Sequence, residues 1–359
     1  MKTLLDVSVG TSILGTIYED DHETIDDIRR IVSSTIGKKE VKKYLAQIGI
    51  PYKSQKDIVY ILGGGSWSDS VSYFSDRKLD INDILNQKVS AMQLNQLYFG
   101  LNEKASAELF SYQWHTQPIM GKGEVWLSLI LNGGSKAGVG DVNVYDKVVE
   151  VKGRGARLVG QRGFGDAKKM SCHLKTAIMQ ISVLLGIHDY KVLDGNGLEW
   201  SVTKTSARLL GDNLKIISNM TGGFSDTDIE IISTIILEAY TNLYVMLNYK
   251  SYVDSFKSAF NEDGSIDVNK YNNEILKISF AYYLQIEKFD YFAMTNELTH
   301  NVLVIEPSMF NHFVDNGTIL YSPQSWGEKA GTQGGYFAIG IDKLSEPTKK
   351  AKPKKKKTK

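Results

Sequence analysis

The stretch "GDVNVYDKVVEVKG", residues 140–153, alternates apolar and polar residues on both sides of a short polar break. Because successive side chains of a strand point to opposite faces, this alternation predicts two strands joined in a hairpin. We take Asp146-Lys147 as the turn, although this pair is a weaker hairpin signal than Asn-Gly. That register predicts a polar face made of Asp141, Asn143, Glu150 and Lys152. It leaves an apolar core face made of Val142, Val144, Val149 and Val151.

The polar face holds two carboxylates, which repel each other unless a cation lies between them. Mg²⁺ prefers hard oxygen ligands and usually takes one or two protein carboxylates. Asp141 and Glu150 are therefore candidate ligands for Mg²⁺ or Mn²⁺, with the carbonyl of Val151 as a third. Lys152 could then orient the attacking water, lower its pKa, or stabilise charge that builds on a phosphate. The alternative is a cross-strand salt bridge, worth at most about 1 kcal/mol if it is exposed.

Three motifs resemble the PD-(D/E)XK nuclease superfamily. Asp141 in "GVGDVNVY" is followed on the next predicted strand by "EVK" at 150–152. "GKGE" places Glu124 at the start of the helix before the first core strand, where many members carry an additional metal-ligating glutamate. The order helix, strand pair, loop, helix, strand, strand over 104–308 also fits that core. Val139-Gly140 stand where a Pro would precede the Asp, a departure shared by many members.

The resemblance implies an α/β (α+β) fold, with a restriction-endonuclease-like core in which helices flank a central mixed sheet. "GKGE", "GDV" and "EVKG.GARL" together look most like nucleases of phage and mobile-element type. In such an enzyme Asp141, Glu150 and Lys152 would be catalytic, and Glu124 would join Asp141 and Glu150 around the metal. The resemblance covers roughly 104–310 and leaves out both 1–100 and the segment 205–275.

The segment 153–169, "GRGARLVGQRGFGDAKK", contains five glycines and five basic residues. Glycines allow the backbone to approach phosphates closely, and arginine matches two phosphate oxygens at once. Beside a metal site, these basic residues predict contact with nucleic acid, and the alternative is a surface loop without a ligand. The candidate nucleic-acid-binding residues are Arg154, Arg157, Arg162, Lys168 and Lys169.

Charge is distributed unevenly along the chain. The last segment, "PTKKAKPKKKKTK" from Pro347, has eight lysines and no acid. Without it, 42 − 8 = 34 basic residues face 41 acidic ones, which gives −7. Its composition predicts a disordered tail at 346–359 that attracts polyanions, and a solubilising tail is the alternative.

The rest of the chain predicts three further regions. Residues 1–100 read as a helix-rich accessory region that binds substrate or a partner, and in it "DIVYIL" (57–62) reads as a strand before a triple glycine. Residues 101–345 read as the nuclease core, with a helical insertion at about 205–275. "LQIEKFD" (284–290) offers Gln285, Glu287 and Lys288 as outer residues of the site.

These features favour a metal-dependent deoxyribonuclease acting on DNA. The rival is a non-catalytic nucleic-acid-binding or virion structural protein on a nuclease-like fold. No stretch approaches the roughly 18 apolar residues of a membrane span, and the first residues make a poor signal peptide. We therefore expect no membrane partner and no secretion through a signal peptide. The resemblance to phage-type nucleases implies a protein of the host cytoplasm or the virion, as a homodimer or in a larger phage assembly.

Overall fold

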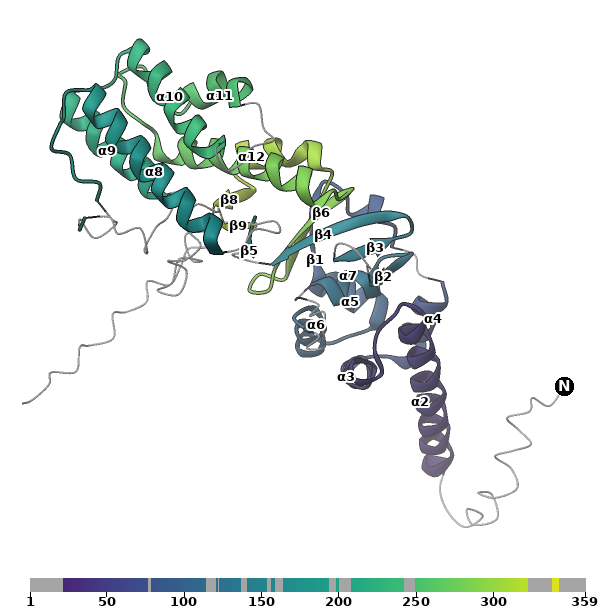
Figure 1. The fold of residues 1–359 in the computed structure, drawn as a ribbon. Coiled ribbons are helices and arrows are strands. Elements are labelled where there is room, and N and C mark those ends of the chain that lie inside the picture. Colours follow the sequence, from purple (N-terminus) through teal and green to yellow (C-terminus); the bar gives the residue numbers. More distant parts are fainter. Residues whose placement is uncertain are drawn as a thin grey trace, which may run out of the picture. The chain divides into compact units, whose positions relative to one another are not determined.

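The computed structural model is a mixed α/β protein and describes most of the chain (Figure 1). The described residues are 22–76, 79–113, 121, 123–136, 141–153, 156–158, 164–193, 198–199, 208–241, 249–321 and 338–341. The chain divides into two compact units. The first comprises Met1–Asp83, Ser90–Gly138 and Val142–Asp146, and the second comprises Ile84–Val89, Val139–Asp141 and Lys147–Lys359.

The first unit is mainly helical, and side chains that accept backbone N–H groups start several of its helices. Ser66, Ser90 and Asn102 each accept from the amide three residues further on, as N-caps do. The helices are α2 His22–Gln47, α3 Tyr52–Leu62, α4 Trp67–Ser75, η2 Ile81–Asp83, α5 Ala91–Phe99, α6 Glu103–Phe110 and α7 Glu124–Ile130. Strand β2 (Gly134–Lys136) pairs antiparallel with β3 (Val142–Val144).

The strand predicted for 57–62 is wrong, because these residues belong to α3. A short β-branched run cannot by itself distinguish a strand from a helix. The tertiary contacts decide, since Ile58, Ile61 and Leu62 are buried on one side of the helix while Tyr60 is 81% exposed. By contrast, the helix expected to start at Glu124 in "GKGE" is confirmed, because α7 begins at Glu124 directly after Gly123.

Trp126 of α7 anchors the core of the first unit. Its ring is fully buried and packs edge-on against Phe110 of α6. The indole N–H donates to Asn95 Oδ1 at 2.7 Å, and Asn95 Nδ2 donates to the carbonyl of Ser106 at 3.1 Å. Asn95 therefore joins α5, α6 and α7 through one buried side chain whose oxygen and nitrogen both have partners.

The second unit holds a mixed group of strands that lie side by side in the order β1-β7-β6-β4. Strand β4 runs parallel to β6, with Glu150 beside Phe292, and β6 runs antiparallel to β7. Their bounds are β1 Gln87–Ser90, β4 Lys147–Gly153, β6 Tyr291–Asn296 and β7 Asn301–Ile305. A smaller sheet has the order β5-β9-β8, with β5 Ala156–Arg157, β8 Ile319–Tyr321 and β9 Ala338–Ile341.

Parallel neighbours such as β4 and β6 need a long crossover connection, and here it is largely helical. The crossover contains α8 Phe164–Leu184, α9 Arg208–Thr221, α10 Asp226–Thr241, η3 Tyr249–Tyr252, α11 Val253–Lys257 and α12 Val268–Glu287. After β7 come η4 Pro307–Met309 and α13 Phe310–Asp315. Along the chain, α8 is followed, after the other helices of the crossover, by β6 and then β7, which are the helix, strand and strand expected at the end of the order over 104–308.

Helix α12 packs on the sheet through aromatic side chains. Asp267 caps its N-terminus by accepting from the amides of Asn269 and Lys270. Phe280 stacks on Phe310 with ring centroids 3.6 Å apart, and it meets Phe292 of β6 edge-on at 5.0 Å. Because Phe292 lies beside Glu150 in the strand register, this packing brings the C-terminal half of α12 to the same face of β4 as Glu150.

Replacing Asn95 with Ala should destabilise the protein by about 2–3 kcal/mol, because the Trp126 N–H and the Ser106 carbonyl would be left buried without their partner. Urea unfolding followed by tryptophan fluorescence measures the change. Asn82→Ala is the control, since the amide of Asn82 bonds to Asp80 at an exposed position, and it should change stability by less than about 0.5 kcal/mol. Equal effects of the two substitutions would contradict this role for Asn95.

Candidate active site

Strand β4 supplies Glu150 and Lys152 to one site. The two residues are separated by one position, so their side chains point to the same face of the strand. That face is the one that α12 covers, and Glu150 is only 5% exposed. The polar face predicted for the hairpin therefore exists for these two residues, but much of it is buried beneath a helix rather than open to solvent.

The carboxylate of Glu150 accepts two hydrogen bonds at the same oxygen, Oε1. One comes from the ammonium of Lys152 and the other from the hydroxyl of Tyr283 on α12. Tyr283 is itself buried, and the Lys152 ammonium lies 5.2 Å from the centre of its ring. Tyr283 could not be predicted from the sequence, because an aromatic residue in a helix usually belongs to the core, and only the packing of α12 shows its contact with Glu150.

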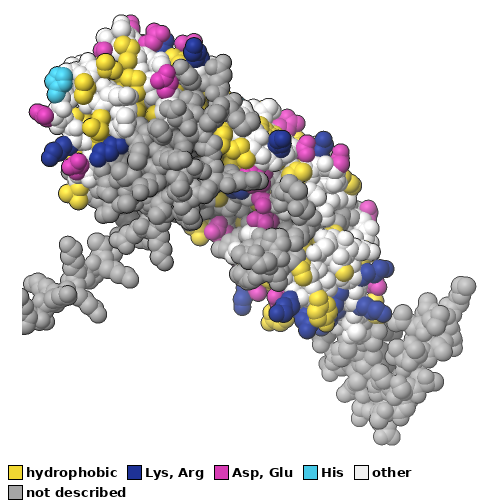
Figure 2. All heavy atoms as spheres, viewed as in Figure 1, with side chains coloured by type: hydrophobic (Ala, Val, Ile, Leu, Met, Phe, Trp, Pro, Cys, Tyr) yellow, Lys and Arg dark blue, Asp and Glu magenta, His cyan; other side chains and the backbone are white. Residues whose placement is uncertain are grey.

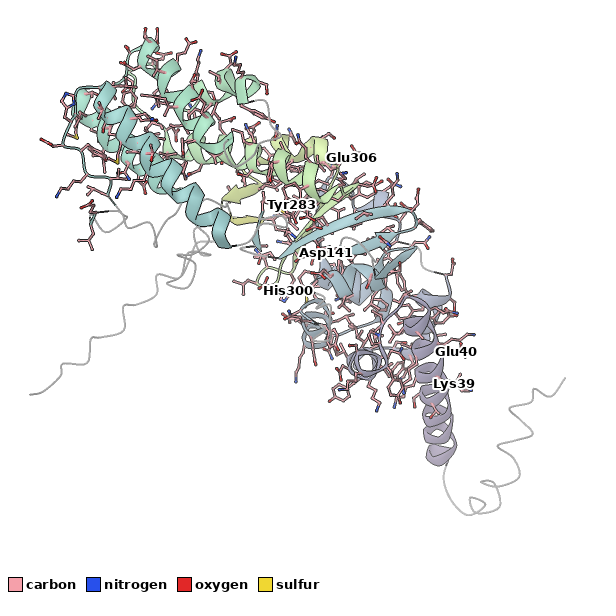
Figure 3. The ribbon with its side chains drawn as sticks, viewed as in Figure 1. Lys39, Glu40, Asp141, Tyr283, His300 and Glu306 are labelled. Carbon is pink, nitrogen blue, oxygen red and sulfur yellow. The ribbon has the colours of Figure 1, made fainter. Side chains whose placement is uncertain are left out.

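Asp141 lies directly before β3 and completes the cluster. Its Oδ2 accepts from the backbone N–H of Val151 at 2.8 Å and lies 4.0 Å from the Lys152 ammonium. Lys152 thus contacts Glu150 and lies within ion-pair distance of Asp141. Figure 3 labels Asp141 and Tyr283, which reach the site from the start of the hairpin and from α12.

The hairpin turn itself differs from the prediction by one residue. Strand β4 already begins at Lys147, and Tyr145 adopts a left-handed backbone with φ of 55°, so the turn comprises Tyr145 and Asp146. The cause is a tertiary contact. The amide of Tyr145 donates to the carbonyl of Gly133 at 3.2 Å, and a Cβ on Gly133 would lie 2.7 Å from the Tyr145 ring.

Negative charge is in excess at this site. Burial, together with the charges of Glu150 and Glu287, raises the pKa of Asp141 to about 6, against the opposing effects of Lys152 and the Val151 N–H. Burial and Glu150 also raise the pKa of Glu287, which Lys152 opposes. Burial is likewise the main cause of the raised pKa of Tyr283, followed by the charge of Glu150. Among the residues that the structure describes, three carboxylates therefore share the ammonium of Lys152.

Glu287 comes from α12, four residues after Tyr283, so the two side chains lie on the same face of the helix. The sequence offers Glu287 as an outer residue of the site. Its charge acts on Asp141, Glu150 and Tyr283. Asp141, Glu150, Lys152, Tyr283 and Glu287 all belong to the second unit.

Glu124 lies in the first unit, where it begins α7. Its amide N–H donates to the carbonyl of Gly121 at 3.3 Å, and its carboxylate folds back beside Gly121. A role for Glu124 in metal binding stays a prediction. Among the described residues, no group of three or more His, Cys, Asp and Glu side chains is arranged to hold a metal ion.

A divalent metal at Asp141 and Glu150 would not need such a group. Mg²⁺ often takes only one or two protein carboxylates and fills its other positions with water or substrate oxygens. The donors at the site are hard oxygens, and burial together with the charge of Glu150 raises the pKa of Asp141 and so disfavours its ionised form. A bound cation would favour that ionised form. The chemistry of Asp141 and Glu150 therefore fits a hard divalent cation.

The predicted DNA-binding residues are only partly described. The backbone places Arg157 in β5 and Lys168 and Lys169 near the start of α8. Arg154, Arg162 and the lysine-rich tail lie outside the described residues. Contact between these residues and DNA stays a prediction.

No family model, curated protein or solved structure matches this chain. The resemblance to PD-(D/E)XK nucleases thus rests on the motifs and their order. Within the part of the chain that the structure describes, no helix has both the length and the apolar character needed to cross a bilayer.

Asp141 should make the metal-free protein less stable as pH rises from about 4 to about 6. An unfolded Asp has a pKa near 3.9, whereas folding raises the pKa of Asp141 to about 6. In this window the folded state binds more protons, so the free energy of unfolding falls with pH. Asp141→Asn removes this effect, and at pH 7 it should be more stable than wild type by up to about 3 kcal/mol.

Urea unfolding in EDTA between pH 4 and pH 7 measures this difference. Asp146→Asn, at the exposed hairpin turn, is the matched control. If the difference in free energy of unfolding between Asp141→Asn and wild type stays constant across this pH range, folding does not raise the pKa of Asp141.

Proposed function

We propose that this protein is a metal-dependent nuclease that hydrolyses phosphodiester bonds in DNA, with Mg²⁺ or Mn²⁺ as the cofactor. The observation that carries the proposal is the meeting of Asp141, Glu150 and Lys152 at one partly buried point with excess negative charge. The order of the three motifs, which resembles the PD-(D/E)XK superfamily, supports the same reading. The parallel β4-β6 pair with α12 packed against it is compatible with the core that this superfamily implies.

The simplest rival for the site is a structural ion pair between Glu150 and Lys152. A buried ion pair gives little net stability, because desolvation of the two charges offsets their attraction. An ion pair between Glu150 and Lys152 also does not explain why two further carboxylates, Asp141 and Glu287, lie at the site. Burial and neighbouring acids raise the pKa values of both. A site that binds a cation accounts for the surplus of carboxylates, whereas a salt bridge does not.

Each residue has a distinct role in the proposed reaction. Asp141 and Glu150 would hold the divalent ion, which when bound supplies Lewis-acid polarisation and lowers the pKa of bound water. The Lys152 ammonium would stabilise the negative charge that builds on the phosphate. Tyr283 would act as a positioning residue, since its hydroxyl holds the carboxylate of Glu150 in place.

Asp141→Asn and Lys152→Met should each reduce metal-dependent cleavage of plasmid DNA at least about 100-fold, because each removes one charge from the reacting centre. Cleavage is followed on gels with Mg²⁺, Mn²⁺ or EDTA. Lys147→Met is the control, because Lys147 is on the same strand as Lys152 but forms a partly exposed ion pair with Asp290, at 3.5 Å.

Two outcomes would count against this function. If Asp141→Asn and Lys152→Met cut as fast as wild type, the site is misplaced. If the folded wild-type protein binds DNA yet never cuts it with either metal, the chain is a non-catalytic nucleic-acid-binding or virion structural protein.

Tyr283→Phe should lower kcat about tenfold while leaving KM for DNA nearly unchanged, because the ring stays but the Glu150 carboxylate loses one of its two donors. The Mg²⁺ concentration for half-maximal activity should rise. Steady-state kinetics over a Mg²⁺ titration measures both effects. Tyr291→Phe is the control, because Tyr291 lies beside Val149 rather than Glu150 in the strand register. A rise in KM alone would show that Tyr283 contacts the DNA instead.

A further inference from the structure

A cavity of about 560 Å³ opens within the first unit, separate from the residues of the candidate active site. Its lining comes from α2, α3, the glycine turn after α3, α4 and α6. The volume lies within the range of about 300–1,000 Å³ that is typical of small-ligand sites. The side chains that could recognise a ligand are Lys38, Lys56, Tyr60, Trp67, Lys104 and Glu108.

The cavity is basic. Its three lysines come from three different helices and face a single acid, Glu108. The surroundings add to this charge, because residues 34–62 contain six lysines and two acids, a net charge of +4. The rest of the chain contrasts with this segment: without the eight C-terminal lysines, its 34 basic and 41 acidic residues give the whole chain a net charge of −7. Figure 2 shows Lys and Arg side chains lying among exposed apolar ones over this unit.

Two aromatic side chains also line the cavity. Tyr60 is 81% exposed, and it lies four residues after Lys56 on α3, so the two side chains share one helix face. An exposed tyrosine of this kind contributes little to the core and is available to a ligand.

The ring of Trp67 is held firmly by two glycines. A Cβ on Gly37 would lie 2.9 Å from the Cβ of Trp67, and one on Gly63 would lie 3.1 Å from its ring carbon Cζ2. The backbone therefore packs directly against the indole at both points. The glycine turn is tied to α6 by Asn102, whose Nδ2 donates to the carbonyl of Gly64 at 3.5 Å.

We propose that this cavity binds single-stranded nucleic acid, with bases stacking on Tyr60 and Trp67 and phosphates paired with Lys38, Lys56 and Lys104. Aromatic platforms combined with a basic groove are the general means of holding a single strand without reading its sequence. The cavity is larger than a single phosphate ion, and a phosphate alone has no flat ring that could stack on Tyr60 or Trp67. The inference rests on the proposed function in one respect: the choice of DNA as the bound strand follows from the proposed deoxyribonuclease activity.

Fluorescence anisotropy with the full chain in EDTA tests the proposal without any cleavage. The probe is a labelled thymidine strand of about twelve nucleotides, a length within the range of known single-strand sites. Tyr60→Ala should weaken binding at least about fivefold through lost stacking. Lys56→Gln should also weaken it and should reduce the slope of affinity against salt by roughly 0.7, the loss of one phosphate contact.

Two controls distinguish binding in the cavity from nonspecific attraction of the strand to surface lysines. Lys53 lies on α3 like Lys56, but it is exposed and does not line the cavity. Lys53→Gln should therefore leave the affinity for the strand nearly unchanged. An abasic strand of equal length, which has the phosphates but no bases, should bind wild type more weakly and should be insensitive to Tyr60→Ala.

Three results would overturn the proposal: equal losses for Lys53→Gln and Lys56→Gln, equal affinity for the abasic strand, or displacement of the probe by poly-glutamate at the same charge concentration. The last would point to an acidic protein partner. The nuclease proposal is judged separately by plasmid cleavage with Mg²⁺. If the wild-type protein never cuts DNA but the cavity variants lose strand binding, the proposed nuclease function is wrong and the inference about the cavity is supported.

Discussion

The candidate site depends on one contact, the packing of α12 against β4 and β6. Phe280 fixes the helix on the sheet, because its ring stacks on Phe310 and meets Phe292 of β6 edge-on. That position lets the Tyr283 hydroxyl reach the buried carboxylate of Glu150, which the Lys152 ammonium also contacts. A carboxylate with so little exposure requires hydrogen-bond donors in fixed places, because an unpaired charge in the interior is strongly unfavourable. The core packing and the polar site are therefore parts of one arrangement.

The same burial creates the electrostatic property on which the proposed chemistry rests. Lys152 is shared among the carboxylates of Asp141, Glu150 and Glu287, and burial together with the charge of Glu150 raises the pKa values of Asp141 and Glu287 in spite of Lys152. A bound divalent cation would relieve this repulsion, and it would also supply what phosphodiester hydrolysis requires. Stability, metal affinity and activity should accordingly respond together to changes at Asp141.

The first unit complements this picture through a different chemistry. Its cavity combines lysines with the aromatic rings of Tyr60 and Trp67, which suits a flexible polyanion that carries flat bases. Together with the basic loop and tail predicted from the sequence, it would direct a mostly acidic chain towards nucleic acid. If both proposals hold, the first unit would bind a strand and the second unit would carry the residues of the reaction.

Local patterns in the sequence determined much of the fold. Period-two alternation predicted the hairpin that carries Asp141, Glu150 and Lys152, and glycine followed by an apolar run predicted that α7 starts at Glu124. These signals work because neighbouring residues alone set side-chain direction and helix starts. The same signals failed at residues 57–62, because an apolar run of that length is compatible with both a strand and a helix.

Only the tertiary structure decided the surroundings of the site. The turn moved to Tyr145-Asp146 because Gly133, twelve residues earlier, contacts the tyrosine ring and backbone. Tyr283 and Glu287 joined the site because α12, separated from β4 by more than a hundred residues, packs over it. The sequence alone determined which residues could supply oxygen ligands and positive charge. It could not determine their burial, their partners or their pKa values, because those depend on contacts between segments that are distant along the chain.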